Sequence, residues 1–198
     1  MRILILLVLI LNLSCKSQSS TPELKANFSA DQIADLKKIT EFFENQICEN
    51  DQTDFKSCFE PILPDLIDVG YEPIFELVDF QMQKVLYNSI GKTTFNEIWN
   101  FCKTTNLKTN KSYQSLCAKG VEGKYADFLL AVGQNNKFLK KYADRLIASG
   151  DFESSTLLQQ WIYTNKESFD LSNPNIKLII AIHYLSINDQ EKRTEQSD

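Results

Sequence analysis

Hydrophobic residues recur every three or four positions along most of this chain, the spacing that places them on one face of an α-helix. The first clear stretch begins at Ser29, where Gln32 three residues later completes a capping box typical of a helix start. Similar stretches follow Pro73, Thr94 and Gly123, and the helical spacing continues to residue 188. The pattern predicts an all-α, single compact domain of about six to eight helices over residues 29–188.

Two helices in the middle of the chain are predicted in more detail. Pro73 suits a first helical turn and Gly91 suits a helix end, so we expect one long helix between them with Ile74, Leu77, Val78, Val85 and Leu86 facing inward. Thr94 and Glu97 form a second capping box and open the next helix. We expect its hydrophobic face to comprise Phe95, Ile98, Trp99 and Cys102, followed by a polar loop from Lys103 to Lys111.

The last element, residues 176–187, is hydrophobic on most of its circumference, and a helix of this kind is buried on all sides. Its β-branched isoleucines would also suit a strand, but the sequence offers no second strand of similar character to pair with it. We therefore expect a buried helix, followed by a charged, disordered tail over residues 189–198.

The first fifteen residues have the order of an export signal: Arg2, an almost unbroken apolar run from Ile3 to Leu11, and a small residue before Cys15. The run is far shorter than the roughly 20 residues that a membrane-spanning helix needs. At Leu13-Ser14-Cys15 the segment resembles the signal of bacterial lipoproteins. That resemblance implies that residues 1–14 are removed and that Cys15 is lipidated and becomes the first mature residue.

The segment between this signal and the helical domain is polar, carries Pro22 and has no hydrophobic period. We expect residues 15–28 to comprise the lipidated cysteine and a flexible tether. The predicted organisation is therefore a signal over residues 1–14, a tether over residues 15–28, the helical domain over residues 29–188 and a tail over residues 189–198.

Five cysteines are an odd number, and in an exported protein a leftover cysteine requires an explanation. Lipidation of Cys15 provides one and leaves four cysteines, an even set that suits two disulfides in an oxidising compartment. Of the three possible connectivities we favour Cys48 with Cys58 and Cys102 with Cys117, because each pair brackets one short polar loop. Reduced, buried cysteines are the alternative, and the spacing is unlike that of structural zinc sites.

The two cysteine-bracketed segments resemble each other faintly, since residues 54–58 (DFKSC) and residues 112–117 (SYQSLC) both follow a polar loop. One interpretation is an internal repeat of helix, linked turn and helix. The other is coincidence, because the shared pattern is short.

Composition and charge narrow the classes of function. Hydrophobic residues make up 43% and charged residues 24%, which are ordinary values for a globular domain. The formal charge of −5 becomes one unit more negative once Arg2 is removed, which argues against a nucleic-acid partner held through its phosphates. The six glycines form no phosphate-binding motif, and we expect no cofactor or metal.

The sequence contains few residues that are candidates for catalysis or binding. The single histidine, His183, lies on a hydrophobic helix face, so we expect a structural core residue more than a catalytic one. Trp99 and Trp161 are expected in the core, and Tyr163 could anchor a partner. Five carboxylates, interpreted as a solvated surface, are Asp65, Asp68, Glu72, Glu76 and Asp79. Three basic residues share a helix face, interpreted as solvated although it could touch anionic lipids: Lys137, Lys141 and Arg145.

These observations favour a membrane-anchored periplasmic lipoprotein that binds a protein or envelope component without chemistry of its own, for example as an inhibitor or immunity protein. Its lipid anchor would hold it to the membrane, with the outer membrane favoured over the inner one. One alternative is a carboxylate-dependent hydrolase of the cell envelope. Another is a secreted eukaryotic glycoprotein, in which Asn27 and Asn110 would be glycosylation acceptors.

Overall fold

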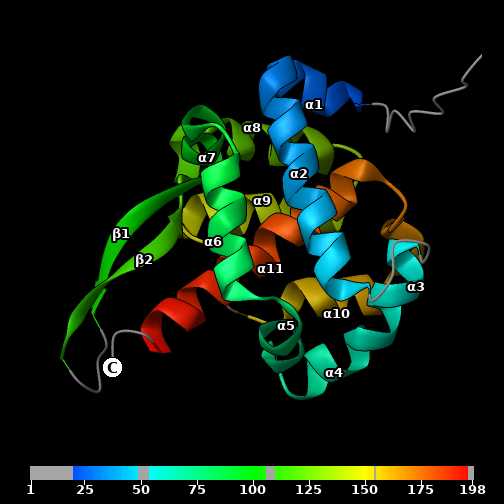
Figure 1. The fold of residues 1–198 in the computed structure, drawn as a ribbon. Coiled ribbons are helices and arrows are strands. Elements are labelled where there is room, and N and C mark those ends of the chain that lie inside the picture. The colour runs from blue at the N-terminus through cyan, green and yellow to red at the C-terminus, as the bar shows by residue number, and fades with distance from the viewer. Residues whose placement is uncertain (1–19, 49–53, 106–109, 154, 196–198) are drawn as a thin grey trace, which may run out of the picture.

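The last helix, α11 (Pro174–Glu195), runs through the middle of the protein, and the other elements pack around it (Figure 1). The computed structural model describes residues 20–48, 54–105, 110–153 and 155–195. Every residue from Leu178 to Asp189 is buried, which confirms the prediction of a buried helix. The structure also confirms a mostly helical domain, with one small two-stranded sheet added to it.

The other described elements follow in chain order. They include short 3-10 turns: η1 (Glu60–Ile62) between α3 and α4, η2 (Gly120–Glu122) between β2 and α8, and η3 (Lys166–Ser168) between α10 and α11. The helices before the sheet are α1 (Pro22–Asn27), α2 (Ala30–Ile47), α3 (Phe55–Phe59), α4 (Leu63–Asp68), α5 (Glu72–Leu77), α6 (Phe80–Ser89) and α7 (Lys92–Ile98). The strands are β1 (Trp99–Thr105) and β2 (Ser112–Ala118), and the helices after them are α8 (Lys124–Gly133), α9 (Lys137–Ser149) and α10 (Leu157–Thr164).

The predicted boundary between tether and domain is wrong, because residues 20–28 fold onto the domain. The side chain of Thr21 accepts a hydrogen bond from the Leu24 amide and begins α1. Leu24 and Phe28 are buried, and the Thr21 hydroxyl donates to Asn175 Oδ1 at 2.5 Å. The hydrophobic residues here are too few to form a visible period, so only their burial against α8 and α11 reveals the helix.

The predicted tail is also wrong at its start, because α11 continues to Glu195. Asp189 is fully buried and forms an ion pair with Arg193, one helical turn further on. A charged pair spaced by four residues stabilises a helix rather than fraying it.

The long helix predicted after Pro73 is divided in two. The Asp79 side chain accepts hydrogen bonds from the amides of Gln81 and Met82, so a new helix begins there. Leu77 and Val85 are 38% and 58% exposed, in contrast to the predicted inward orientation. Such interruptions explain why the helices are shorter and more numerous than predicted.

One predicted capping box is confirmed and the other is wrong. Ser29 and Gln32 form the reciprocal hydrogen bonds of a capping box at the start of α2. Thr94 instead lies inside α7, where its hydroxyl donates to Asp35 Oδ2 at 2.8 Å. The Gly91 amide donates to the same carboxylate oxygen at 2.8 Å, so α7 is held to α2 by a tertiary contact.

The largest departure from the prediction is the β-hairpin. Trp99 and Cys102 were expected on a helix, but α7 ends at Ile98 and the chain continues as β1, paired antiparallel with β2. An isolated hairpin is marginally stable in water, and this one is fixed to α11. Trp99 Nε1 donates to Ser186 Oγ at 2.8 Å, and Gln190 Nε2 donates to the Leu116 carbonyl at 2.8 Å.

Both predicted disulfides are present. Cys48 and Cys58 link the end of α2 to α3, with Cα atoms 5.4 Å apart. Cys102 and Cys117 link β1 to β2, with Cα atoms 5.9 Å apart. Because the first pair joins helices and the second joins strands, the hypothesis of an internal helical repeat is wrong.

Candidate functional site

The hairpin presents two chemically different faces at its base. Side chains alternate along a strand, and the register pairs Cys102 with Ser115 and Thr104 with Tyr113 on one face. Phe101 points to the opposite face. The first face carries the disulfide and a row of hydroxyl groups, whereas the second is aromatic.

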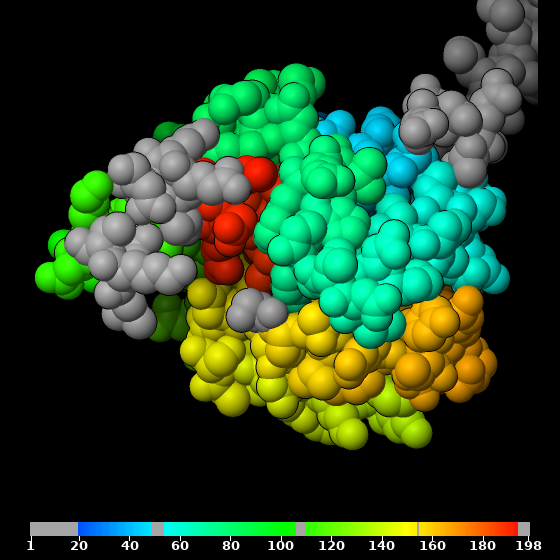
Figure 2. Space-filling model, turned by 90° about the horizontal axis from the view of Figure 1, so that it is seen from below, coloured from blue at the N-terminus to red at the C-terminus, as the bar shows by residue number. Residues whose placement is uncertain are grey.

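The hydroxyl-bearing face forms one wall of a cleft of about 450 Å³. The opposite wall is the α4–α5 segment, including Tyr71, Glu72 and Phe75, and the floor is the last part of α11. Figure 2 shows α11 (red) between the cyan-green segment that contains α4 and α5 and the yellow segment that follows α9. The cleft is within the size range of ligand sites in proteins.

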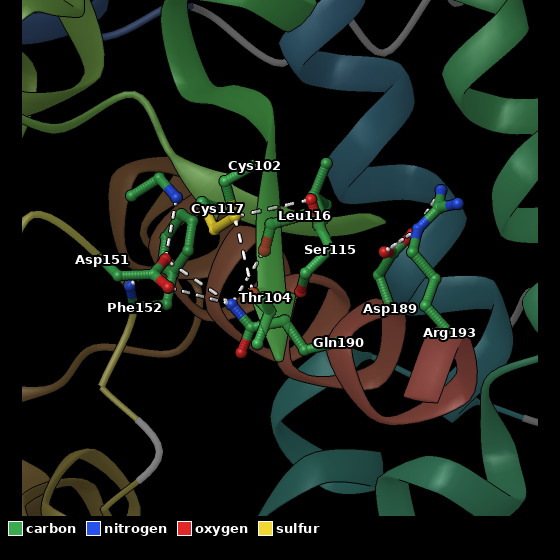
Figure 3. Close-up of a disulfide and its surroundings, with 11 residues drawn as sticks. Cys102, Thr104, Ser115, Leu116, Cys117, Asp151, Phe152, Asp189, Gln190 and Arg193 are labelled. Atoms are coloured by element: carbon green, nitrogen blue, oxygen red, sulfur yellow. Dashed lines mark hydrogen bonds and ion pairs between the residues drawn. A yellow bond between two sulfur atoms is a disulfide. The ribbon is translucent and has the colours of Figure 1, made fainter. Parts of the chain in front are cut away.

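Asp151 holds the base of this cleft together. Its Oδ1 accepts hydrogen bonds from the Ala118 amide at 2.8 Å and the Phe152 amide at 2.7 Å. Gln190 Nε2 lies 3.4 Å from its Oδ2, so the carboxylate connects β2 to α11 (Figure 3). Burial raises the pKa of Asp151, and the amide donors from Ala118 and Phe152 oppose that rise. The carboxylate is therefore a structural acceptor.

Behind Tyr71, a buried network contains the single histidine. His183 is 1% exposed; its Nε2 lies 3.3 Å from the Tyr71 hydroxyl and its Nδ1 lies 3.1 Å from the Tyr142 hydroxyl. The Tyr71 hydroxyl donates its one proton to the Ser155 carbonyl at 2.8 Å. Nε2 must then carry the hydrogen that Tyr71 accepts, and Nδ1 accepts from Tyr142. The network fixes one tautomer of His183.

The pKa shifts of this network keep it uncharged at neutral pH. Burial lowers the pKa of His183 to about 3, although the Glu153 carboxylate opposes the shift. Burial also raises the pKa of Tyr71 to about 12. His183 has a partner on each ring nitrogen and is separated from the cleft by Tyr71. Its predicted burial is confirmed, and its structural role stays a prediction.

The cleft is acidic. Glu72 and Glu191 line it together with Asp151. Of the five carboxylates singled out from the sequence, only Glu72 lies here; Asp79 begins α6, and Asp65, Asp68 and Glu76 are exposed elsewhere on α4 and α5. Within the described residues, no group of three or more histidine, cysteine or acidic side chains is arranged to hold a metal ion.

The other residues selected from the sequence lie away from this cleft. Trp99 is fully buried, Trp161 is half-buried and Tyr163 is 43% exposed. Lys137, Lys141 and Arg145 are exposed on α9, and Arg145 forms an ion pair with Glu153. Cys15 lies outside the described residues, so its lipidation stays a prediction.

The cleft residues that the sequence reasoning missed include Thr104, Tyr113, Ser115, Asp151, Gln190 and Glu191. A signal was present in residues 112–117, where polar and apolar or aromatic side chains partly alternate and β-formers are frequent. It was weak because the matching alternation in residues 99–105 also fits the continuation of a helix.

No protein-family model, curated protein or solved structure matches this chain. Over the part of the chain that the structure describes, none of the helices combines the length and the apolar character required to cross a bilayer.

Proposed function

We propose that this protein is a lipid-anchored, periplasm-facing binding module that recognises a protein partner through the acidic cleft beside the hairpin. The acidic cleft is the observation that carries the proposal. Glu72, Glu191 and Asp151 bring negative charge to it, and Thr104, Ser115 and Tyr113 add hydroxyl groups. A Lys or Arg side chain of the partner would find both charge and hydrogen-bond acceptors there.

The construction of the cleft supports binding. Its walls come from the hairpin, the α4–α5 segment and α11, and the Cys102–Cys117 disulfide and Asp151 fix the hairpin wall. A wall fixed before binding loses little conformational entropy when a partner docks. An inhibitor or immunity protein is one form of this function, because such a protein needs a rigid surface that masks part of an enzyme.

The predicted lipid anchor supports a location at a membrane of the cell envelope. The resemblance of residues 1–15 to lipoprotein signals and the two disulfides both fit an oxidising envelope compartment. With α1 beginning at Pro22, few residues would separate Cys15 from the folded domain. The folded domain would then lie close to the membrane surface.

Hydrolysis by carboxylates is the second candidate, favoured by the gathering of Glu72, Glu191 and Asp151 around one cleft. Asp151 is already engaged by two backbone amides, which leaves Glu72 and Glu191 as the groups for acid and base roles. Release of soluble fragments from isolated cell-wall glycan by the wild-type protein, and its loss in Glu72→Gln, would favour this candidate over binding.

The proposed binding function is tested by crosslinking in native membranes. A photoreactive side chain at Thr104 is expected to form an adduct with one partner protein. The double substitution Glu72→Lys with Glu191→Lys should remove the adduct, because it reverses the charge of the cleft.

The matched control is Asp127→Lys with Glu167→Lys, which makes the same change of charge at two exposed positions outside the cleft. This control should retain the adduct. Loss of the adduct in both double variants, or in neither, would contradict recognition through the cleft.

A further inference from the structure

A second groove lies on the opposite side of β1 from the acidic cleft. It has a volume of about 410 Å³ and is formed by α6, α7, β1 and the last turn of α11. Figure 1 shows α6, α7 and β1 on one side of the molecule, near the end of α11. Its principal lining residues are Lys84, Tyr87, Lys92, Phe95, Phe101 and Arg193.

The floor of this groove is a continuous set of aromatic rings. Fully buried Trp99 packs against Phe95 with ring centroids 5.4 Å apart, and Phe95 packs against Phe101 with centroids 5.6 Å apart. Tyr87 lies 5.4 Å from Phe95, again between centroids. Phe101 ends the series and is 47% exposed. A large ring held by core aromatics yet open to solvent is a surface on which another flat ring can stack.

The charge of the groove is the reverse of the charge of the protein. Lys84, Lys92 and Arg193 line it, and none of the described residues that line it is acidic, whereas the whole chain has a formal charge of −5. The carboxylate of Asp189 is fully buried, is paired with Arg193 and lies close enough to Lys84 to interact with its charge. The Arg193 guanidinium lies 4.9 Å from the centroid of the Phe101 ring, so positive charge adjoins the exposed aromatic surface.

We propose that this groove binds a small planar organic anion, of the aromatic carboxylate or aromatic sulfonate class. The ring of the ligand would stack on Phe101 and Phe95, and its anionic group would meet Lys84 and Lys92. The side-chain amides of Asn88 and Asn96 also line the groove and can donate hydrogen bonds to the anion. Because this groove and the acidic cleft use opposite faces of β1, the failure of one proposal leaves the other standing.

Anilinonaphthalene sulfonate is a suitable probe, because it combines a fused aromatic ring with one negative charge. Its uncharged relative N-phenylnaphthylamine has the same rings without the sulfonate. We expect one molecule of the sulfonate to bind per chain, with an affinity that falls as salt concentration rises. The uncharged relative should bind at least about tenfold more weakly, and salt should not weaken it.

Two variants separate the aromatic and the charged parts of the site. Phe101→Ala, and independently Lys84→Gln with Lys92→Gln, should each weaken binding of the sulfonate about tenfold. Phe101→Leu keeps the apolar bulk but not the ring, and should fall between wild type and Phe101→Ala. Thermal unfolding of each variant confirms that it is folded before titration.

The control is Tyr163→Ala with Lys166→Gln, because the Lys166 ammonium lies 5.7 Å from the ring of exposed Tyr163 on another part of the surface. This control should bind the sulfonate as wild type does. The proposal is overturned if the Phe101 and lysine variants stay within about twofold of wild type, or if the charged and uncharged probes bind equally well.

Discussion

The two disulfide-linked segments have similar spacing and different structures. The Cys48–Cys58 segment joins α2 to α3 and directs Phe55 and Phe59 into the core, where their rings stack 5.0 Å apart beside Tyr184 of α11. The Cys102–Cys117 segment is a hairpin whose two faces line a polar cleft and an aromatic groove. One disulfide therefore stabilises part of the core, and the other stabilises a hairpin that lines the surface cleft and groove.

This difference shows what cysteine spacing specifies. A pair separated by 10 or 15 residues around a polar loop suits a disulfide, whatever the backbone on each side. The neighbouring hydrophobic residues decide the rest: Phe55 and Phe59 are both buried, whereas Phe101 beside Cys102 is half exposed. The core region should therefore respond to substitutions through stability, and the hairpin through binding.

The largest difference in the free energy of unfolding is expected between alanine substitutions at two phenylalanines. Phe59→Ala should lower the free energy of unfolding by about 3 to 5 kcal/mol, because it leaves a cavity among fully buried rings. Phe101→Ala should change it by only about 0.5 kcal/mol, since much of that ring is already in water. Urea denaturation measures both, and equal losses would remove the distinction between the two regions.

Removing either disulfide should lower stability by a similar amount, but the two removals should differ in their effect on binding. Removing either pair as a double alanine variant should cost about 3 kcal/mol of stability in the chain-entropy model. Cys102→Ala with Cys117→Ala should also weaken the crosslink formed from Thr104, because the hairpin wall of the cleft loses its covalent link. Cys48→Ala with Cys58→Ala should leave that crosslink intact under conditions where the variant is folded. The reverse pattern would place recognition in the helical region.

The pH dependence of stability tests whether His183, which lies behind Tyr71 of the cleft, is buried and neutral. Burial lowers its folded pKa to about 3 from an ordinary value of 6.5, so the unfolded state takes up the proton first as pH falls. This contribution to stability is complete above about pH 6.5 and decreases by about 1.4 kcal/mol per pH unit towards pH 3.

His183→Gln should lower stability at pH 7 by about 1 to 3 kcal/mol and should remove this part of the pH dependence. The difference between wild-type and variant stability across pH 5 to 6.5 isolates the histidine from the buried carboxylates. Equal slopes for the two proteins would contradict a neutral, buried His183.

The smallest effect on the fold is expected at Cys15. Cys15→Ala should leave the denaturation curve unchanged, because residues 20–195 contain the folded elements that the structure describes. It should move the protein from the membrane fraction to the soluble fraction, and intact mass should show a lipid only on the wild type. An unmodified wild-type protein beginning elsewhere than Cys15 would refute the anchor.

The sequence was sufficient for the features that depend on local pattern. The buried last helix, the Ser29 capping box, both cysteine pairs and the burial of His183 all follow from nearby residues. The hairpin does not, because its strands are held by contacts between residues far apart. Trp99 contacts Ser186 across 87 positions, and Gln190 contacts Leu116 across 74.

The acidic cleft could not be predicted from the sequence for the same reason. Glu72 was noted among exposed carboxylates, but its partners in the cleft come from the hairpin, from Asp151 and from the end of α11. The sequence of that end is typical of a disordered tail, because nothing in its run of charged residues distinguishes the Asp189–Arg193 pair that keeps it helical. Charge patterns at a chain end do not distinguish a solvated tail from a helix held by buried ion pairs.

Oxidative footprinting of the protein in its own native membranes shows whether a partner covers the acidic cleft. Tyr113 and Phe75 line the acidic cleft, and Tyr163 lies on a separate exposed surface. We expect Tyr113 and Phe75 to be oxidised more slowly in native membranes than in the purified protein, and Tyr163 to be oxidised at the same rate in both. Protection of Tyr163 with no change at Tyr113 and Phe75 would contradict recognition through the hairpin cleft.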